Sequence, residues 1–375
     1  MKKLSRPLRL LIVQPYLPRY RVPFFDRLIP RLAADDIDCR VAIPTAPLVQ
    51  LDRGDSADAP WTLHTQARSF DLAGRSFSMY GSAQARRGAD AVITGLASTS
   101  VDTWAALYGR GRRIPVGLWG HVRNYVSAPS ALDQRLKQIQ ARRADHVFAY
   151  TPQGALEAQR WGVSAGKVTC VMNTIDTTEL RQAQKRLTAD EIAAFANKHR
   201  LQRGRTSVFI GALDATKRID FMANVLDELW QSDPHFKILL GGHGDCHNLL
   251  MPAIKRGQVI DMGFVTPAGK ALIGACASTL CMPGRVGLVA VDALALKLPI
   301  ITTDWRFHAP EVDYLEEGKN LIRTTDSAFA STLRQHTEQA SSTSPTTVDP
   351  PLLDDMVLRF HQGVRRMLRT STLTH

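Results

Sequence analysis

Residues 281–304 read CMPGRVGLVAVDALALKLPIITTD, and this stretch decides the fold. An apolar run that ends at Pro283 predicts a strand, and the Gly-containing loop after it predicts a helix that begins near Gly287. A second apolar run, Pro299–Thr303, predicts another strand directly after that helix. A strand, a helix and a second strand in this order form a βαβ unit, in which the two strands run parallel.

The same alternation of short apolar runs and longer helical patterns continues along almost the whole chain, whose 375 residues suffice for about two domains. It predicts an α/β fold of two Rossmann-like doubly wound domains facing across a cleft. The series of strands pauses in the polar stretch between Asn173 and Arg205. We therefore predict an N-terminal domain over 1–175, a C-terminal domain over 176–350, and a final helix in 351–375 that packs back on the N-terminal domain. The expected strands are 8–13, 39–43, 90–94, 115–119, 146–150, 168–172, 207–211, 236–241, 259–262, 279–282, 299–303 and 320–323.

Composition excludes several classes of protein. Hydrophobic residues make up 44 % and charged residues 22 % of the chain, which is typical of a globular protein. No run of 18 apolar residues is present, and the apolar stretch behind MKKLSRPLR is short for a signal peptide. Five cysteines without a CxxC pair favour neither disulfides nor zinc, so we expect a cytoplasmic location.

Positive charge is concentrated in the first part of the chain. The formal net charge is +12, and residues 1–150 hold 22 Lys and Arg against 12 Asp and Glu, whereas residues 151–375 hold 25 against 23. Such a surplus attracts nucleic acid, anionic lipid or phosphorylated small molecules. A nucleic-acid-binding protein has only this charge in its favour, because no aromatic RNA-binding signature or zinc-finger spacing accompanies it. No GxGxxG motif follows an expected strand, which argues against a dehydrogenase.

Three loops after expected strands of the second half have the residues for binding phosphate. Lys217 lies near a helix start, where the helix dipole favours anions, although a solvated surface lysine is about as common. Gly242 belongs to a glycine cluster, GGHGD, that allows close backbone approach and that is also common in plain turns. Arg285 adds charge beside the amides near Gly287. Asp292 lies in an apolar helix, so it either faces solvent or has a partner such as a ribose hydroxyl or a cation.

In their order and chemistry these blocks resemble the family-4 glycosyltransferases, retaining enzymes of the GT-B fold, and in particular bacterial polysaccharide-biosynthesis members. In that family a strand–Gly–Arg–Leu–…–Lys block is followed by a Gly-rich turn and by a loop–helix with two glutamates separated by seven residues. Here GALDATK, GGHGD and PGRVGLVAVDALALKLPIITTD match these blocks, and PYLPRYRVPFFDRL, LWGHVRN, ADHVFAYT, NTID and HAPEVDYLEEGKN resemble further ones. The resemblance covers roughly residues 8–325. It implies a donor-binding set of Gly211, Arg218, Gly242, Gly284, Gly287, Leu288 and Asp292.

Two departures from the family pattern bear on the mechanism. The family arginine after Gly211 is Ala212, and the first glutamate of the pair falls at Gly284. The second glutamate falls at Asp292, which could still bond the ribose hydroxyls. We hypothesise that Arg285 or Arg218 replaces the lost positive charge.

The resemblance also implies roles for the N-terminal half. His121 matches a position that lines the donor-sugar pocket, although a lone histidine after a strand is often structural. Arg19, Tyr20 and Arg21 follow the first strand where GT-B enzymes face the diphosphate and the acceptor. The apolar residues of the segment 22–32, with Arg27 and Arg31 between them, favour packing on the first sheet over a membrane-surface face. The basic surplus still favours loose attachment to an anionic inner leaflet.

The implied reaction is retaining transfer of a sugar from a nucleotide-diphosphate sugar to a glycan or lipid-linked acceptor in bacterial surface polysaccharide synthesis. Positive charge must stabilise the departing diphosphate, and Lys217, Arg285 and the amides near Gly287 are the candidates, with His121 as the third catalytic candidate. The second half of the chain, with its candidate phosphate loops, contains no DxD motif, so we expect neither metal nor cofactor. The alternatives are a nucleotide-sugar 2-epimerase of the same fold and a degenerate, non-catalytic transferase partner. His308 and Glu311 in HAPE could serve the site or begin a helix.

Overall fold

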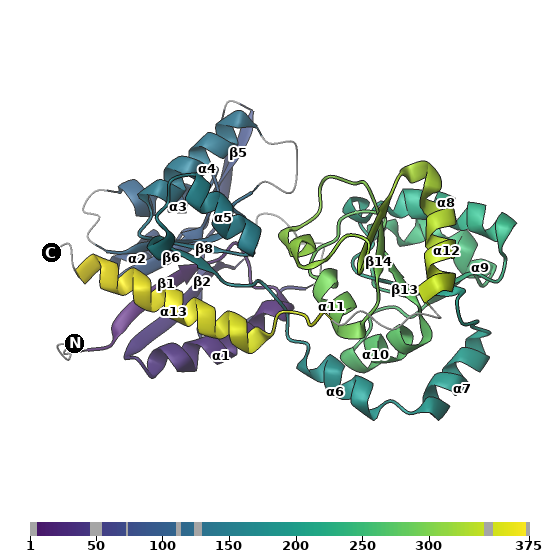
Figure 1. Ribbon diagram of the computed structural model, residues 1–375. Helices are drawn as coiled ribbons and strands as arrows, with labels where there is room; N and C mark the ends of the chain where they lie inside the picture. The colour runs from purple at the N-terminus through teal and green to yellow at the C-terminus, as the bar shows by residue number, and fades with distance from the viewer. Residues whose placement is uncertain are drawn as a thin grey trace. The chain divides into compact units, whose positions relative to one another are not determined.

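The computed structural model describes residues 6–45, 55–72, 74–109, 114–123, 130–340 and 348–372. Their contacts divide the chain into two compact units. The N-terminal unit comprises Met1–Ile175 together with Leu352–His375, and the C-terminal unit comprises Asp176–Pro351. Each unit contains a parallel sheet with helices on both faces (Figure 1), so the predicted α/β fold with two Rossmann-like units is confirmed.

The sheet of the N-terminal unit has seven strands within the described residues, and every neighbouring pair is parallel. Their order is β3-β2-β1-β6-β7-β8-β9. The strands are β1 (Leu8–Val13), β2 (Ile37–Pro44), β3 (Thr62–Thr65), β6 (Ala91–Gly95), β7 (Val116–Gly120), β8 (His146–Ala149) and β9 (Val168–Cys170). The helices are α1 (Val22–Ala33), α2 (Ala83–Arg87), α3 (Val101–Tyr108), α4 (Ala131–Arg143), α5 (Pro152–Arg160) and α13 (Leu353–Thr372).

The central strand β1 shows why the sequence pattern predicts this sheet so directly. Leu10 and Ile12 point to one apolar cluster and Leu11 and Val13 to another, because successive side chains of a strand face opposite sides. Both sides of a doubly wound sheet are covered by helices, so its strands are continuous apolar runs. The cluster on one side includes residues of α1 and α13, and the cluster on the other includes residues of α3, α4 and α5.

The apolar side chains of α1 belong to the core. Phe24, Phe25, Leu28 and Leu32 are fully buried, and α13 lies alongside α1 (Figure 1). The favoured interpretation, packing on the first sheet, is therefore confirmed, and the membrane-surface interpretation of this helix is wrong. Gly363 of α13 allows the close approach, because a Cβ at this position would lie 2.5 Å from the ring of Phe148 in β8.

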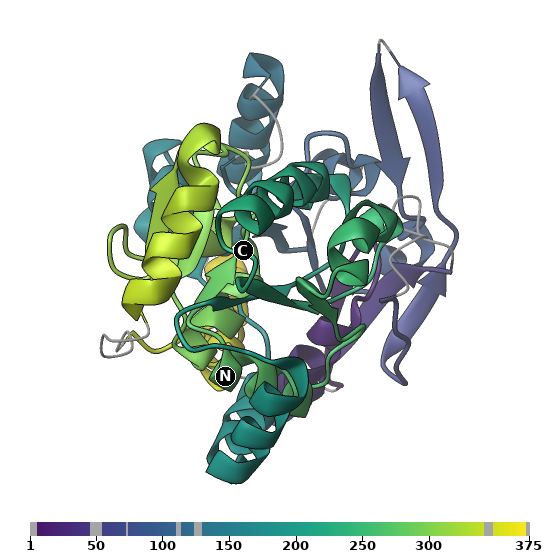
Figure 2. The ribbon, with the colours of Figure 1, turned by 90° about the vertical axis from the view of Figure 1, so that its right-hand side faces the viewer.

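The sequence prediction missed one short strand and one hairpin. The strand is β3, and the hairpin consists of β4 (Arg68–Leu72) and β5 (Arg75–Met79), which pair antiparallel outside the main sheet. The tip of the hairpin projects from the N-terminal unit, and its two strands are blue-violet in Figure 2. Its residues are largely exposed, so they lack the continuous apolar run that identifies a buried parallel strand.

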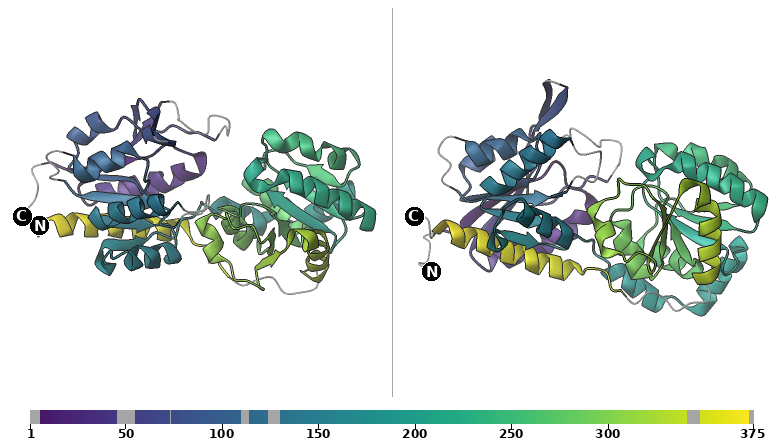
Figure 3. Two further views of the ribbon diagram at one scale, coloured as in Figure 1. Left: turned by 90° about the horizontal axis from the view of Figure 1, so that it is seen from above. Right: turned by 45° about the horizontal axis from the view of Figure 1, so that its top comes forward.

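The sheet of the C-terminal unit has six parallel strands within the described residues, in the order β12-β11-β10-β13-β14-β15. The strands are β10 (Thr206–Ile210), β11 (Lys237–Gly241), β12 (Val259–Asp261), β13 (Thr279–Cys281), β14 (Ile300–Thr303) and β15 (Leu321–Thr324). Helices lie on both faces of this sheet (Figure 3). They are α6 (Thr178–Arg186), α7 (Ala189–His199), α8 (Ile219–Ser232), α9 (Met251–Lys255), α10 (Pro267–Cys276), α11 (Val289–Leu296) and α12 (Phe329–Ala340). Every predicted strand is found, with bounds that differ by at most two residues.

Candidate functional site

Two glycine-containing loops of the C-terminal unit lie directly against each other. One follows β10 and the other follows β11, and these strands are neighbours in the sheet. The amide of Gly211 donates to the carbonyl of Gly241 at 3.0 Å, and the amide of Leu213 donates to that of His243 at 2.8 Å. A Cβ at Gly242 would overlap the carbonyl oxygen of Gly211. The predicted glycine cluster is therefore required by contact between two backbones.

A third loop, after β13, is hydrogen-bonded to the loop after β10. The amide of Arg285 donates to the carbonyl of Thr216 at 2.9 Å, and the Lys217 ammonium donates to the carbonyl of Arg285. A Cβ at Gly284 would lie 2.5 Å from both the carbonyl oxygen of Thr216 and the carbonyl carbon of Lys217. The structure thus brings Lys217 and Arg285 together, as predicted for a phosphate site. It also explains Gly284, because a glutamate there would push the two loops apart.

The loop after β13 leads into the start of α11, with Leu288 as the N-cap. In the part of the chain that the structure describes, the amides of Gly287, Leu288 and Val289 donate to no acceptor. The first amides of a helix lack partners within the helix and carry its partial positive charge, so they favour an anion. Leu288 and Gly287 therefore lie where the sequence predicts a phosphate to bind, beside Lys217 and Arg285.

His308 is a buried donor next to these cations. Its Nδ1 accepts the amide of Val286 at 3.1 Å, so the neutral ring carries its proton on Nε2. Burial, followed by the positive charges of Arg323, Lys217 and Arg285, lowers its pKa to about 4. Nε2 is buried and has no hydrogen-bond partner among the described residues. Buried donors are normally satisfied, so this one indicates an acceptor that the described residues do not supply. From the sequence, His308 in HAPE could either serve the site or begin a helix, and no pattern decided between the two.

Asp292 has the buried environment that its apolar helix predicts. It is 6 % exposed, and its Oδ2 lies 2.7 Å from the Nζ of Lys270 in α10. The solvent-facing alternative is therefore wrong, and the partner is a cation. Sequence reasoning missed Lys270, since it lies 22 positions before Asp292, on the other side of strand β13, and no motif connects the two residues. Asp292 lies on the first turn of α11, close in the chain to the unpaired amides.

The guanidinium of Arg218 is engaged by other side chains of the C-terminal unit. Its guanidinium forms two hydrogen bonds with the Asp326 carboxylate, at 2.7 and 2.6 Å, and a third with Thr303 at 3.1 Å. It also stacks on Phe221 at 4.2 Å from the ring centroid. A bidentate pair fixes both partners. Of the two arginines that could replace the lost charge, Arg218 is therefore fixed by Asp326 and Thr303, and Arg285 lies in the loop that contacts Lys217.

The N-terminal candidates divide into buried and accessible residues. Arg21 is 4 % exposed, with its guanidinium on Asn173 Oδ1 at 2.9 Å and 5.1 Å from the Trp119 ring centroid. It therefore stabilises the core, and a phosphate contact would break these interactions. Arg19 and Tyr20 remain exposed in a 3-10 turn after β1. His121 follows β7, and its ring packs 4.5 Å from that of Tyr150.

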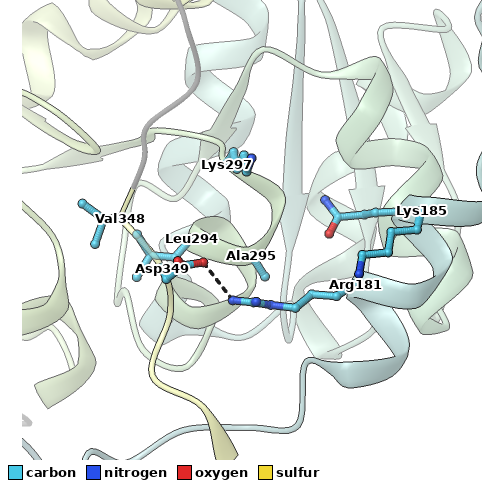
Figure 4. Close-up of a pocket in the computed structure, with 8 residues that line it drawn as sticks. Arg181, Lys185, Leu294, Ala295, Lys297, Val348 and Asp349 are labelled. Atoms are coloured by element: carbon cyan, nitrogen blue, oxygen red, sulfur yellow. Dashed lines mark hydrogen bonds and ion pairs between the residues drawn. The ribbon is translucent and has the colours of Figure 1, made fainter.

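A hollow of about 580 Å³ lies at the other end of α11 from these loops (Figure 4). Arg181 of α6 points across it to Asp349 at 3.1 Å, while Lys185 and Lys297 line its edges. Cations are favoured at the C-terminal end of a helix, where carbonyl groups are unpaired, so Lys297 needs no ligand to explain it. We do not include this hollow in the candidate site.

Two features are absent from the part of the chain that is described. No group of three or more His, Cys, Asp or Glu residues there is arranged to hold a metal ion. None of the helices there is long and apolar enough to cross a membrane.

The comparisons with known proteins agree with this fold. Residues 204–339 match the family described as Glycosyl transferases group 1, and they contain all three loops and Asp292. No curated protein matches the chain. Among solved structures, HepE from Anabaena in complex with UDP and glucose is 13 % identical and has a TM-score of 0.62, over 96 % of this chain and 99 % of that one.

Two further structures are similar over almost their whole length. The UDP-GlcNAc 2-epimerase from Methanocaldococcus jannaschii is 14 % identical, with a TM-score of 0.58 over 96 % of this chain and 99 % of that one. The lipopolysaccharide outer core galactosyltransferase WaaB, in its apo form, is 13 % identical, with a TM-score of 0.55 over 97 % and 99 %. At these identities the likeness shows the fold, and the fold of this chain is GT-B.

Proposed function

We propose that the protein is a retaining glycosyltransferase. It would move a sugar from a nucleotide-diphosphate sugar to a glycan or lipid-linked acceptor in bacterial surface polysaccharide synthesis. The observation that carries the proposal is the group of unpaired amides and cations at the start of α11. There the unpaired amides of residues 287–289 lie in the same loop system as Lys217, Arg285 and the unsatisfied Nε2–H of His308.

The chemistry of this site suits a departing diphosphate. When the bond between the anomeric carbon and the donor oxygen breaks, negative charge develops on the diphosphate. Fixed cations and helix amides stabilise that charge without reorganisation. Lys217 and Arg285 would supply the cations, and no metal ion or cofactor is part of the proposal. For retention, the acceptor oxygen bonds the anomeric carbon on the face that the diphosphate leaves, and the diphosphate oxygen takes the acceptor proton.

Asp292 would bind the ribose hydroxyls, the role that the resemblance implies for its position. A carboxylate accepts hydrogen bonds from two neighbouring hydroxyl groups, and the ion pair with Lys270 would hold it in place. The structures of HepE with UDP and UDP-glucose support a nucleotide-sugar ligand for this fold. Donor-site glycines 211, 242 and 284 would serve by keeping the loops close together.

Arg19 and Tyr20, which are exposed after β1, would contact the acceptor or a phosphate. The buried Arg21 is not part of this proposed acceptor site. His121 would line the donor-sugar pocket from the N-terminal unit. The protein would act in the cytoplasm, in peripheral contact with the anionic inner leaflet of the cell membrane, and without nucleic acid as a partner. These assignments rest on the resemblance and on the positive charge of the first 150 residues.

Thermal shift tests the proposal without knowledge of the sugar. A ligand that binds only the folded state raises the melting temperature by mass action. We expect one of UDP, GDP, ADP and CMP to stabilise the protein equally with and without magnesium. Lys217→Ala and Asp292→Asn should abolish the shift, whereas Lys185→Ala, in the hollow at the far end of α11, should keep it. Absence of a shift with every nucleotide would contradict a nucleotide-sugar site.

A 2-epimerase is the second candidate, favoured by the similarity to the M. jannaschii epimerase along the whole chain. Incubation with UDP-GlcNAc in the absence of an acceptor separates the two functions. An epimerase converts the donor to its 2-epimer, which NMR detects directly, whereas a transferase leaves the sugar configuration unchanged and at most hydrolyses the donor slowly. Nucleotide binding with neither hydrolysis nor transfer would instead indicate a degenerate, non-catalytic partner.

A further inference from the structure

Several large apolar side chains of the N-terminal unit are exposed, in contrast to those of α1. Eleven large hydrophobic side chains are exposed among the described residues, and five of them lie on the hairpin β4–β5, the end of α3, and α4. These five, with exposures of 40 to 62 %, are Phe70, Leu72, Tyr108, Leu132 and Ile139. Exposed apolar side chains that lie singly need no explanation, but a contiguous group indicates a surface for binding.

The hairpin is amphipathic across its two faces. Directly opposed residues of an antiparallel pair share a face, so Phe70 and Phe77 lie together, and their rings stack at 5.6 Å. Leu72 and Arg75 form the next pair on that face, and Arg68 and Met79 form the previous one. The other face holds only serines and Asp71. Such a division predicts that the first face contacts an apolar environment.

Side-chain contacts join the hairpin to α4, and α4 to α3. The Arg75 guanidinium donates to the Asp133 carboxylate at the start of α4. The guanidinium of Arg143, at the end of α4, lies 5.6 Å from the ring centroid of Tyr108 in α3. Leu132 and Ile139 are seven residues apart and therefore lie on the same side of α4 as Arg143. Arg75 therefore connects the hairpin to the start of α4, and Arg143 connects the end of α4 to α3. We call the exposed apolar and basic residues of these elements the basic–apolar face.

The basic–apolar face carries positive charge without compensating acid. Arg68, Arg135 and Arg143 are exposed on it. Of the acids on the same elements, Asp71 lies on the opposite face of the hairpin and Asp133 pairs with Arg75. The third, Asp102, is buried and accepts the amides of Tyr80 and Ser82. Arginines interspersed with exposed Phe, Leu, Ile and Tyr are typical of a surface that binds an anionic bilayer.

We propose that the basic–apolar face docks on an anionic lipid bilayer, with Phe70 and Leu72 of the hairpin entering the interface and the arginines contacting headgroups. The choice of a membrane partner rests on the proposed function, because a lipid-linked acceptor lies in a bilayer. The position of the face rests on the exposed residues alone. The hairpin projects from its unit (Figure 2; Figure 3), so its apolar face can reach a flat surface.

Sedimentation of the full chain with large unilamellar vesicles tests the proposal. We expect binding to phosphatidylcholine vesicles that contain about 30 mol% phosphatidylglycerol, which gives them an anionic surface. We expect weak binding to vesicles of phosphatidylcholine alone, and loss of binding at high salt. Phe70→Ser/Leu72→Ser should weaken binding at least about tenfold, since both apolar groups leave the interface. Arg135→Ala should weaken it about fivefold, the effect of one surface-proximal cation.

A matched control comes from the other unit. Leu249 and Phe264 are comparably exposed, at 46 and 76 %, so Leu249→Ser/Phe264→Ser removes as much apolar surface without touching the face. Equal loss of vesicle binding in both double variants, or binding that is independent of phosphatidylglycerol, would overturn the proposal. So would a dimer in size-exclusion chromatography that Phe70→Ser/Leu72→Ser disrupts, because the face would then bind a second copy. The nucleotide-induced thermal shift, measured on the same variants, reports separately on the proposed function.

Discussion

Removing Lys270 should weaken α11 because it leaves Asp292 buried without a counter-charge. In Lys270→Met the flexible side chain keeps most of its volume, so the chief change is the loss of the ammonium 2.7 Å from Asp292 Oδ2. Removing one partner of a buried ion pair costs about 3–5 kcal/mol. The Asp292 side chain is 8 % exposed but that of Lys270 is 23 % exposed, so water already screens part of the pair. We therefore expect a loss of about 2–4 kcal/mol.

Hydrogen exchange of the full chain measures this loss where it occurs. Under conditions in which exchange reports the opening equilibrium, 2–4 kcal/mol corresponds to protection falling by about 30- to 900-fold. The fall should appear in peptides covering α10 and α11 and should be absent from β1 and α13 in the N-terminal unit. Lys185→Met, an exposed lysine on α6, is the matched control and should change protection little.

The double-mutant cycle separates the ion pair from the packing of the two side chains. Asp292→Asn alone leaves Lys270 able to reach water, so it should cost less than Lys270→Met. Lys270→Met/Asp292→Asn should be more stable than the sum of the single losses by about 1–3 kcal/mol, since no buried charge remains. A loss below about 0.5 kcal/mol in Lys270→Met, or strict additivity, would refute the idea that this pair holds Asp292 in place.

Three further changes test the site and the core. Gly284→Ala places a Cβ 2.5 Å from the carbonyl oxygen of Thr216, so it should lower the free energy of unfolding by about 1–3 kcal/mol and abolish the nucleotide-induced thermal shift. In the control Gly269→Ala the Cβ meets only ordinary contacts, so the shift should remain. Equal behaviour of the two variants would contradict the close approach of the loops at Gly284. Because His308 has its pKa lowered to about 4, the unfolded state binds a proton first as pH falls through about 6.5. Stability should therefore drop by about 2 kcal/mol between pH 7 and pH 5. Urea unfolding followed in the C-terminal unit should show this slope, and an unchanged slope in His308→Asn would assign it to other groups. Arg21→Met removes a buried hydrogen bond and a cation stacked on aromatic rings, so it should lower the free energy of unfolding by about 1–3 kcal/mol. The amides of α13 should then exchange faster. Unchanged protection of α13 would mean that Arg21 does not stabilise the core.

The sequence by itself determined the class of fold and the places of the three loops of the candidate site. Continuous apolar runs such as Leu8–Val13 identify parallel strands because both faces of a doubly wound sheet are covered. The loops with Lys217 and Arg285 follow parallel strands, which end at the same edge of the sheet, and in the structure these two loops are in contact. The burial of the apolar stripe of α1 followed from periodicity in the same way.

Only the tertiary structure decided which residues are partners. Asp292 pairs with Lys270, Arg218 with Asp326, and Arg21 enters the aromatic core, although charge and position made each arginine a plausible phosphate ligand. The hairpin β4–β5 escaped prediction because it is exposed and lacks a strong apolar pattern. The physical reason is common to these cases. Periodicity reports which side of an element is buried, but contacts between elements distant in the sequence determine what each polar side chain meets.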